Sequence, residues 1–236
     1  MKKHIKRMAA PSSWAIPRKT TYWVTKPSPG PHGTEDAVPL LAVVRDMLKL
    51  CDNSREARFI IGSRMITVDG KVVTDYKFPV GLMDVVTVTK TKQSYRMLVD
   101  YKSRLKLVPV DDTEKGWKLA RIDCKTVVKK GKVQLNLHDG RCILLPKDQY
   151  KSGDVLKIEV PSQKIMKAFK LEKGNLAFLV GGSHPGTVQT IEDYQVGRGS
   201  SANLVSFKEG FSTVTDNVFV VGDKTPEINL PEAKAA

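Results

Sequence analysis

The sequence predicts a multi-domain α+β protein: a small unit with a helix pair and a hairpin, followed by two mainly antiparallel, barrel-like β domains. Three observations lead to this prediction. The chain has 236 residues, which is more than a domain of about 150 residues needs. Helical periodicity is found over residues 37–62, and from residue 93 onwards brief alternating runs are separated by turn residues. We therefore divide the chain into segments 1–36, 37–92, 93–172 and 173–236.

The first segment, residues 1–36, is predicted to be an extended basic arm, because it is rich in Pro, Ser and Thr and has no periodicity. Its candidate RNA-contacting cations are Lys2, Lys3, Lys6, Arg7, Arg18 and Lys19. The aromatic residues Trp14, Tyr22 and Trp23 lie among them, and this combination suits phosphate contact and base stacking. The alternative is that these rings dock on the protein's own surface.

Two short helices and a hairpin are predicted in residues 37–92. Apolar residues recur at helical spacing over 37–50, and Asn53 with Glu56 forms a capping box for a second helix that ends at Gly62. A hairpin follows over residues 65–73, because Asp69-Gly70 tolerates the positive φ of a type I′ turn. A third strand is predicted for residues 84–89.

The second helix carries cations on one face. Arg55 and Arg58 are three residues apart and therefore share a face opposite the apolar residues, and Arg64 follows just beyond the helix end. These three arginines predict a short positive ridge. Arg45, on the first predicted helix, is a further candidate contact.

The rest of the chain reads as two β domains. In the third segment, strands are predicted at 95–100, 104–110, 133–137, 142–145, 155–160 and 164–171. Four lysines, Lys125, Lys129, Lys130 and Lys132, cluster around Gly131 at a loop-like site. They could be solvated or could contact phosphates, and Lys129, Lys130 and Lys132 are the candidate RNA contacts. In the last segment, a strand, a tight glycine-rich turn and a strand over residues 176–191 precede strands at 204–207 and 218–221.

The charge balance favours a polyanionic partner. The chain has 39 basic and 25 acidic residues, a net charge of +14, and its apolar runs are far below the roughly 18 residues that span a bilayer. Membranes are therefore not expected as partners. The basic N-terminus lacks an apolar core and is interrupted by prolines, which argues against a signal or transit peptide and for a cytoplasmic protein.

Sequence patterns for catalysis and cofactor binding are absent. The glycine-rich stretches do not match phosphate-binding fingerprints, and the four histidines have no carboxylate or cysteine partners at motif spacing. Cys51, Cys124 and Cys142 lie far apart without zinc-ligand spacing. We therefore expect a binding protein that is not an enzyme and that takes no metal, cofactor or small-molecule substrate.

Three stretches resemble the S-four-type RNA-binding domain: Asn53-Ser54-Arg55-Glu56-Ala57-Arg58 with Gly62, then Ile66-Thr67-Val68-Asp69-Gly70-Lys71-Val72-Val73, then Pro79-Val80-Gly81-Leu82-Met83-Asp84-Val85-Val86. The resemblance implies that the helix pair and the hairpin form an RNA-gripping surface. It places Arg55, Arg58, Arg64 and Lys71 on that surface.

Downstream, Gly174-Asn175-Leu176-Ala177-Phe178-Leu179-Val180-Gly181-Gly182 with Gly186 and Ile191 is similar to a KOW motif, found in ribosomal proteins and transcription elongation factors. The expected loop residues are Gly182, His184 and Gly186. Ser183 and His184 stand where RNA-holding KOW loops usually carry Arg or Lys, and residues 173–236 hold 5 basic against 7 acidic residues. This loop is therefore expected to pack against a neighbouring protein.

The order of these parts resembles the archaeal and eukaryotic small-subunit ribosomal proteins of the e-type S-four-e family over nearly the whole chain. The resemblance implies a structural constituent of the cytoplasmic small ribosomal subunit, whose partners are small-subunit rRNA and neighbouring ribosomal proteins. A KOW-containing regulatory factor of transcription or translation is the alternative. An RNA-modifying enzyme ranks third, because the remaining strands show no catalytic motif.

Overall fold

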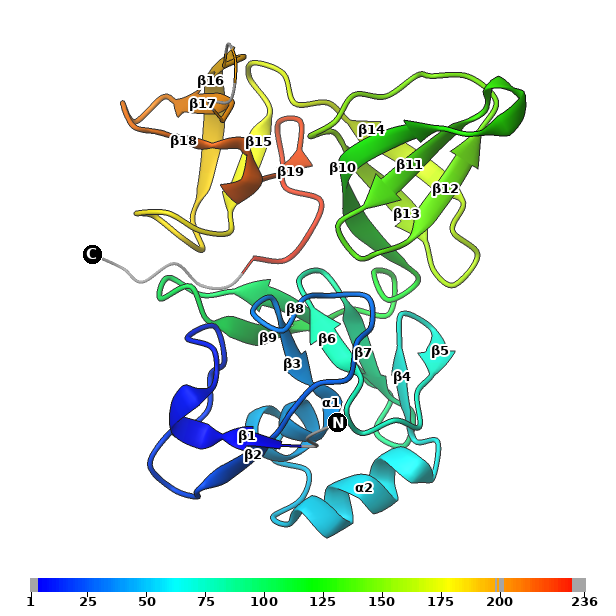
Figure 1. Ribbon diagram of the computed structural model, residues 1–236, viewed down its shortest axis with the longest axis vertical. Coiled ribbons are helices and arrows are strands. Elements are labelled where there is room, and N and C mark those ends of the chain that lie inside the picture. Colours follow the sequence, from blue (N-terminus) through cyan, green and yellow to red (C-terminus); the bar gives the residue numbers. More distant parts are fainter. Residues whose placement is uncertain (1–3, 198, 200–201, 231–236) are drawn as a thin grey trace. The chain divides into compact units, whose positions relative to one another are not determined.

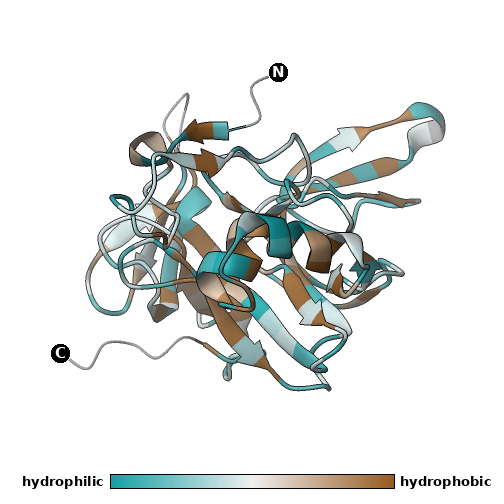
Figure 2. Cartoon of the chain, turned by 90° about the horizontal axis from the view of Figure 1, so that it is seen from below, coloured by the Kyte–Doolittle hydropathy of each residue, from teal (hydrophilic) through white to brown (hydrophobic). Residues whose placement is uncertain are grey.

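The computed structural model describes residues 4–197, 199 and 202–230, and it divides into two compact units (Figure 1). Unit 1 comprises Met1–Leu98 with Arg104–Lys118, and unit 2 comprises Val99–Ser103 with Leu119–Ala236. The structure is mostly antiparallel β-sheet with a few short helices, which confirms the predicted fold class. Figure 2 shows hydrophobic and hydrophilic residues alternating along the strands.

Unit 1 is built on a five-stranded sheet in the order β5-β4-β7-β8-β9. Its strands are β4 (Ile66–Val68), β5 (Lys71–Val72), β7 (Val85–Val88), β8 (Gln93–Val99) and β9 (Leu105–Val110). The hairpin is confirmed, because β4 pairs with β5 and both turn residues, Asp69 and Gly70, have positive φ. A separate pair joins β3 (Ala37–Pro39) to β6 (Pro79–Gly81).

Of the two helices predicted in unit 1, the second is confirmed and the first is mostly replaced by other structure. Helix α2 (Ser54–Gly62) starts with the expected capping box, in which the Glu56 carboxylate accepts a hydrogen bond from the Asn53 backbone N–H at 3.4 Å. The first predicted helix is mostly replaced by β3, a single turn α1 (Leu40–Ala42) and a π-helical segment, Val43–Met47. Residues 37–44 are all buried, so their apolar pattern does not distinguish a helix from a buried strand.

The unit boundary falls later in the chain than residue 92. Strands β8 and β9 extend the sheet of unit 1, with Val86 opposite Tyr95 across β7 and β8. Alternation in sequence marks a strand but does not say which sheet the strand joins. The first two β runs of the third predicted segment therefore complete the fold of the second.

The N-terminal segment is a folded part of unit 1, which corrects the expectation of an extended arm. Strand β1 (His4–Lys6) pairs with β2 (Trp23–Thr25), and a 3-10 turn, Arg7–Ala9, follows β1. The Trp14 side chain is 1% exposed and its backbone bridges to Leu105. For Trp14, the alternative of docking on the protein's own surface is therefore correct.

Arg7 and Arg18 hold this segment together. The Arg7 side chain is buried, donates hydrogen bonds to the Pro17 carbonyl and the Thr21 hydroxyl, and lies 3.7 Å from an Asp46 carboxylate oxygen. The Arg18 guanidinium donates hydrogen bonds to the backbone carbonyls of Ala10 at 2.7 Å and Pro11 at 2.6 Å. Guanidinium groups thus satisfy carbonyls that a segment with so little regular structure would otherwise leave unpaired.

The centre of unit 1 contains a buried ionic cluster formed by His32, Asp69, Asp84 and Lys118. The Lys118 side chain is fully buried, and its Nζ lies 2.7 Å from Asp69 Oδ2 and 2.9 Å from Asp84 Oδ1. Asp84 Oδ2 lies 2.9 Å from His32 Nε2. Gly81 permits this approach, because a Cβ there would lie 2.4 Å from the His32 ring.

Each carboxylate in the cluster also accepts a backbone hydrogen bond: Asp69 from Val85 N and Asp84 from Gly81 N, both at 3.0 Å. Burial by itself raises the pKa of Asp84, but the neighbouring charges of Lys118 and His32 and their hydrogen bonds outweigh burial and hold the pKa well below its usual range. The cluster therefore contains an ionised carboxylate throughout the physiological pH range.

Unit 2 contains two five-stranded antiparallel sheets. The first has the order β12-β11-β10-β13-β14, and the second has the order β18-β17-β16-β15-β19. The strands of the first are β10 (Trp117–Val127), β11 (Val133–Leu137), β12 (Cys142–Leu145), β13 (Val155–Glu159) and β14 (Ile165–Phe169). Those of the second are β15 (Leu176–Leu179), β16 (Val188–Gln195), β17 (Leu204–Phe207), β18 (Ser212–Val214) and β19 (Val218–Gly222).

We predict that Lys118→Met destabilises unit 1 by about 3–5 kcal/mol, because it leaves two buried carboxylates without their cation. All three tryptophans lie in unit 1, so tryptophan fluorescence during urea unfolding of the whole chain reports on that unit. Lys106→Met, at an exposed position of β9, is the control. Equal unfolding midpoints for the two variants would contradict the role of the cluster.

We also predict a defined pH dependence for Asp84→Asn. The folded-state pKa of Asp84 is lowered below its unfolded value of about 3.9, so the stabilisation is present above that value and is lost as pH falls through the folded-state pKa. The difference in unfolding free energy between wild type and variant should stay constant from about pH 8 to about pH 5 and shrink only below about pH 4. A difference that disappears near pH 6 would assign the effect to another group.

Arg18→Ala should lower the stability of unit 1 by about 1–3 kcal/mol, because backbone carbonyls lose their charged donor. Lys19→Ala removes the same charge from an exposed neighbour and should leave the unfolding midpoint unchanged. The same fluorescence titration compares them. Two variants of equal stability would show that Arg18 does not hold the segment.

Candidate nucleic-acid interface

The three arginines predicted to form a ridge, Arg55, Arg58 and Arg64, are all exposed on or just after α2. We call them the arginine ridge. On the opposite side of α2, Ala57 and Ile61 are fully buried, so the amphipathic pattern fixes which face is presented to solvent. The Arg58 guanidinium lies 4.5 Å from the centre of the Tyr76 ring, which supports its side chain. Lys71 is exposed on the neighbouring hairpin.

A shallow groove of about 410 Å³ adjoins the ridge and is lined by Leu50, Cys51, Arg55, Glu56, Phe59 and Ile60. The Phe59 side chain is 71% exposed. The hydrogen bonds from Asn53 hold the pKa of Glu56 below its ordinary value, and burial raises the pKa of the Cys51 thiol. The groove therefore presents one guanidinium, one carboxylate and an exposed ring, while its thiol stays protonated at neutral pH.

Several predicted contacts are used inside the protein instead. Arg45 is half-buried and donates hydrogen bonds to both Asp46 carboxylate oxygens and, at 2.7 Å, to the Ser54 hydroxyl. Arg7 and Arg18 have the structural roles described above. Lys6 and Lys19 are exposed, whereas Lys2 and Lys3 lie outside the described residues. The list of cations in the sequence therefore separates into those that stabilise the fold and those that face outward.

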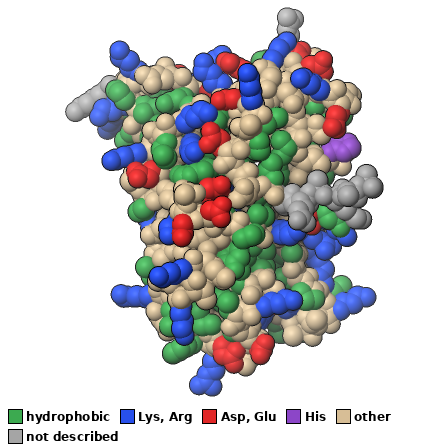
Figure 3. Space-filling model, turned by 180° about the vertical axis from the view of Figure 1, so that it is seen from behind, with side chains coloured by type: hydrophobic (Ala, Val, Ile, Leu, Met, Phe, Trp, Pro, Cys, Tyr) green, Lys and Arg blue, Asp and Glu red, His purple; other side chains and the backbone are tan. Residues whose placement is uncertain are grey.

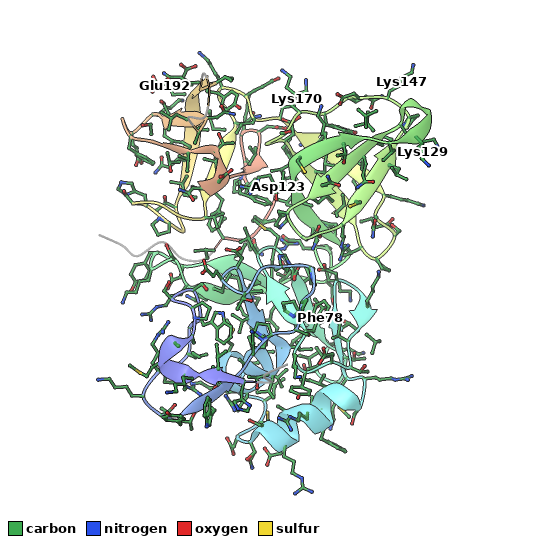
Figure 4. The ribbon with its side chains drawn as sticks, viewed as in Figure 1. Phe78, Asp123, Lys129, Lys147, Lys170 and Glu192 are labelled. Carbon is green, nitrogen blue, oxygen red and sulfur yellow. The ribbon has the colours of Figure 1, made fainter. Side chains whose placement is uncertain are left out.

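In unit 2, lysines collect at one end of the β10–β11–β12 sheet. Lys129 follows β10, Lys132 precedes β11, and Val133 pairs with Leu145, which brings Lys147 to the same end. In Figure 4 the side chains of Lys129 and Lys147 point outward from the protein at this end of the sheet. We call Lys129, Lys132 and Lys147 the lysine end; the side chain of Lys130 lies outside the described part of the chain. Sequence reasoning missed Lys147, which the strand register alone brings close.

Lys125, which neighbours the same cluster in sequence, is not part of the lysine end. Its Nζ lies 2.7 Å from Asp148 Oδ2 and donates a hydrogen bond to the Tyr150 carbonyl. Proximity in sequence therefore overstated the cluster by one residue and understated it by another.

The loop between β15 and β16 has the glycines that the KOW resemblance implies. Gly182 and Gly186 both have positive φ, and a Cβ at Gly186 would lie 2.8 Å from the backbone of Asp100 and Tyr101. Gly186 is therefore required for close backbone packing. His184 is exposed, with its ring centre 4.6 Å from that of Phe211.

At the opposite end of the β15–β16 hairpin and on the neighbouring β14, basic side chains are paired with acids. Lys173 lies 2.8 Å from Asp193, Lys167 lies 3.1 Å from Asp223, and Lys170 lies 3.8 Å from Glu172. Hydrogen bonds to these carboxylates raise the pKa values of Lys167 and Lys173. On the face drawn in Figure 3, basic and acidic side chains are likewise interspersed. The arginine ridge and the lysine end differ from this surface, because their described side chains are exposed and form no ion pair with a carboxylate of the described residues.

The described residues offer neither a metal-binding cluster nor a membrane-spanning helix. Among them, no group of three or more His, Cys, Asp or Glu side chains is arranged to hold a metal ion. None of the helices in the described part of the chain is both long and apolar enough to cross a bilayer.

Family models match three consecutive parts of the chain. The RS4NT domain matches residues 1–35, the S4 domain matches residues 38–86, and Ribosomal family S4e matches residues 91–165. The S4 match includes the arginine ridge up to Arg64 and the hairpin with Lys71. The match of residues 1–35 is consistent with a folded N-terminal segment.

Relatives extend this match to nearly the full length. The chain is 44% identical to small ribosomal subunit protein eS4 of Methanothermobacter thermautotrophicus over 99% of its length and 98% of the relative. It is 47% identical to the protein of that name from Archaeoglobus fulgidus, over 94% of each chain. The crystal structure of the 30S ribosomal protein S4e from Thermoplasma acidophilum superposes with a TM-score of 0.71 and 37% identity, covering 80% of this chain and 96% of that one. The chain is therefore a member of the eS4 family of small ribosomal subunit proteins.

Proposed function

We propose that this protein is a structural constituent of the small ribosomal subunit that binds and stabilises small-subunit rRNA. The observation that carries the proposal is the arginine ridge: three exposed guanidinium groups, two on α2 and one just after it, with no ion pair to a carboxylate among the described residues. Unpaired arginines on a rigid helix suit phosphate oxygens, which they can bind in a bidentate manner.

The two outward basic surfaces would act on the RNA backbone more than on base edges. The major groove of A-form RNA is too deep and narrow for side chains to read, so contact with a folded rRNA helix falls on phosphates and 2′-hydroxyls. Such contacts position a protein without reading sequence. The arginine ridge with Lys71 would grip one backbone, and the lysine end would add a second contact.

We call the surface formed by Lys167, Lys170, Lys173 and their carboxylate partners the acid-paired surface; it would contact a different partner. Its lysines, Lys167, Lys170 and Lys173, are paired with Asp223, Glu172 and Asp193. The loop with Gly182 and His184, at the other end of the β15–β16 hairpin, is exposed and carries no lysine or arginine. A neutral surface of this kind suits a neighbouring ribosomal protein better than RNA. On this proposal the protein makes and breaks no covalent bond, and it works in cytoplasmic small subunits without a cofactor or small-molecule substrate.

We predict that the triple variant Arg55→Ala, Arg58→Ala, Arg64→Ala binds small-subunit rRNA more weakly and has a log-log salt slope that is smaller by about two to three units. Each lost phosphate contact reduces the slope by roughly 0.7–0.9. Filter-binding titrations at several salt concentrations measure both quantities. An unchanged affinity and slope would exclude the ridge as an RNA contact.

The control variant removes three positive charges from the acid-paired surface: Lys167→Ala, Lys170→Ala, Lys173→Ala. It changes the net charge of the chain equally, so a general charge effect would alter both variants alike. Sedimentation of small subunits isolated from cells adds a second test. A structural constituent stays with the subunits after a high-salt wash, whereas a transient regulatory factor is released.

A further inference from the structure

We propose that the outer face of the β1–β2 ribbon is a stacking platform for unpaired RNA bases. We call this face the aromatic ribbon; it is formed by His4, Lys6, Tyr22 and Trp23. The inference rests on the proposed function, because it takes rRNA as the partner, but it names a different surface and a different chemistry from the arginine ridge.

Strand alternation explains why these side chains face outward. In the β1–β2 register, Ile5 is opposite Val24 and Lys6 is opposite Trp23. Val24 is 3% exposed, so that side of the ribbon packs inward and the side with Lys6 and Trp23 faces away from the core. Tyr22 directly precedes β2 and lies beside Trp23.

Two of these rings are largely exposed, unlike the other two tryptophans of the chain. Trp23 is 51% exposed and Tyr22 is 63% exposed, whereas Trp14 and Trp117 are 1% and 8% exposed. The core of unit 1 thus accepts two tryptophans and leaves the third in solvent. A group of large aromatic side chains on a protein surface is typical of a binding site.

The rings meet edge to face. The centre of the Trp23 ring is 4.7 Å from that of His4, with an interplanar angle of 68°, and 4.8 Å from that of Tyr22, with an angle of 81°. An edge contact covers at most one face of a ring, so the three rings support one another while flat aromatic surface remains for a ligand.

Basic side chains lie next to the aromatic ribbon, so the two together suit an anionic ligand that also has a flat aromatic part. The Lys6 ammonium lies 5.5 Å from the centre of the Tyr22 ring. An adjoining hollow of about 380 Å³ is lined by Lys6, Met8, Arg18, Lys19, Thr20, Thr21 and Tyr22. Arg18 is bound to backbone carbonyls, so the cations that this lining offers are the exposed Lys6 and Lys19. The lining also has three hydroxyl groups and no carboxylate, which suits a phosphate group.

Aromatic rings beside a basic hollow suit a nucleotide that is not base-paired. In an RNA duplex both faces of each base are covered by its neighbours, whereas unpaired bases in loops and bulges can stack on aromatic side chains. The arginine ridge has the opposite character, with charge predominating. The two surfaces would therefore hold different parts of a folded RNA, a backbone and a splayed-out base.

The test compares the binding of a single-stranded ten-nucleotide oligouridylate by the full-length wild type and by Tyr22→Ala, Trp23→Ala. Base stacking is worth about 1–3 kcal/mol per base, so the affinity should fall at least about tenfold. The salt slope should stay unchanged, because no charge is removed. The conservative variant Tyr22→Phe, Trp23→Phe keeps rings at both positions and should retain most of the affinity.

A second measurement needs no variant. Irradiation of wild-type protein with the same oligonucleotide carrying 5-bromouridine should cross-link Tyr22 or Trp23, mapped by mass spectrometry. Cross-links found only elsewhere, or unchanged affinity in the alanine variant, would overturn the platform. If the arginine-ridge variant still loses rRNA affinity in that case, the proposed function stands while the platform fails. Wild-type protein that binds phosphatidylserine vesicles through these rings, and not the oligonucleotide, would also overturn it.

Discussion

The fully buried ammonium group of Lys118 is the constraint on which the rest of unit 1 depends. A buried cation is stable only when opposite charge and hydrogen bonds replace its water, and here Asp69 and Asp84 provide that charge at 2.7 and 2.9 Å. Asp69 belongs to the hairpin turn, Asp84 to the residues before β7, and His32 to the N-terminal segment. The ion pairs of Lys118 thus fix the hairpin and the N-terminal segment in one arrangement within unit 1. The arginine ridge is presented by an element that packs on this arrangement.

The basic residues of the chain therefore have two separate tasks. Lys118, Arg7, Arg18 and Arg45 are bound to carboxylates, hydroxyls or carbonyls of the protein itself. Arg96 is similar, since its buried guanidinium lies 3.0 Å from a Glu114 carboxylate oxygen, and burial lowers its pKa. Arg55, Arg58, Arg64 and the lysine end are exposed. A net charge of +14 is thus a poor measure of the RNA-binding surface, because part of it holds the protein together.

Local sequence patterns predicted most secondary-structure elements correctly, but they did not predict the tertiary contacts between residues far apart in the chain. The capping box of α2, the Asp69-Gly70 turn and the outward face of Arg55 and Arg58 all follow from interactions between residues a few positions apart. The burial of Trp14, the arrival of Lys147 at the lysine end and the pairing of Lys118 with Asp69 depend on contacts between distant parts of the chain. A lysine paired with a carboxylate 49 residues away reads in sequence like any solvated lysine. The same limitation made Arg7, Arg18 and Arg45 candidate RNA contacts.

The central claim is that the cations that stabilise this fold and the cations that meet rRNA are different side chains. A density map of the native small subunit, at a resolution that shows side chains, tests it most directly. The account predicts phosphate groups within hydrogen-bond distance of Arg55, Arg58 and Arg64, with Arg7, Arg18 and Lys118 still bound to their partners within the protein. A map in which α2 faces solvent, or in which Arg7 and Arg18 leave their carbonyls to bind phosphates, would contradict it.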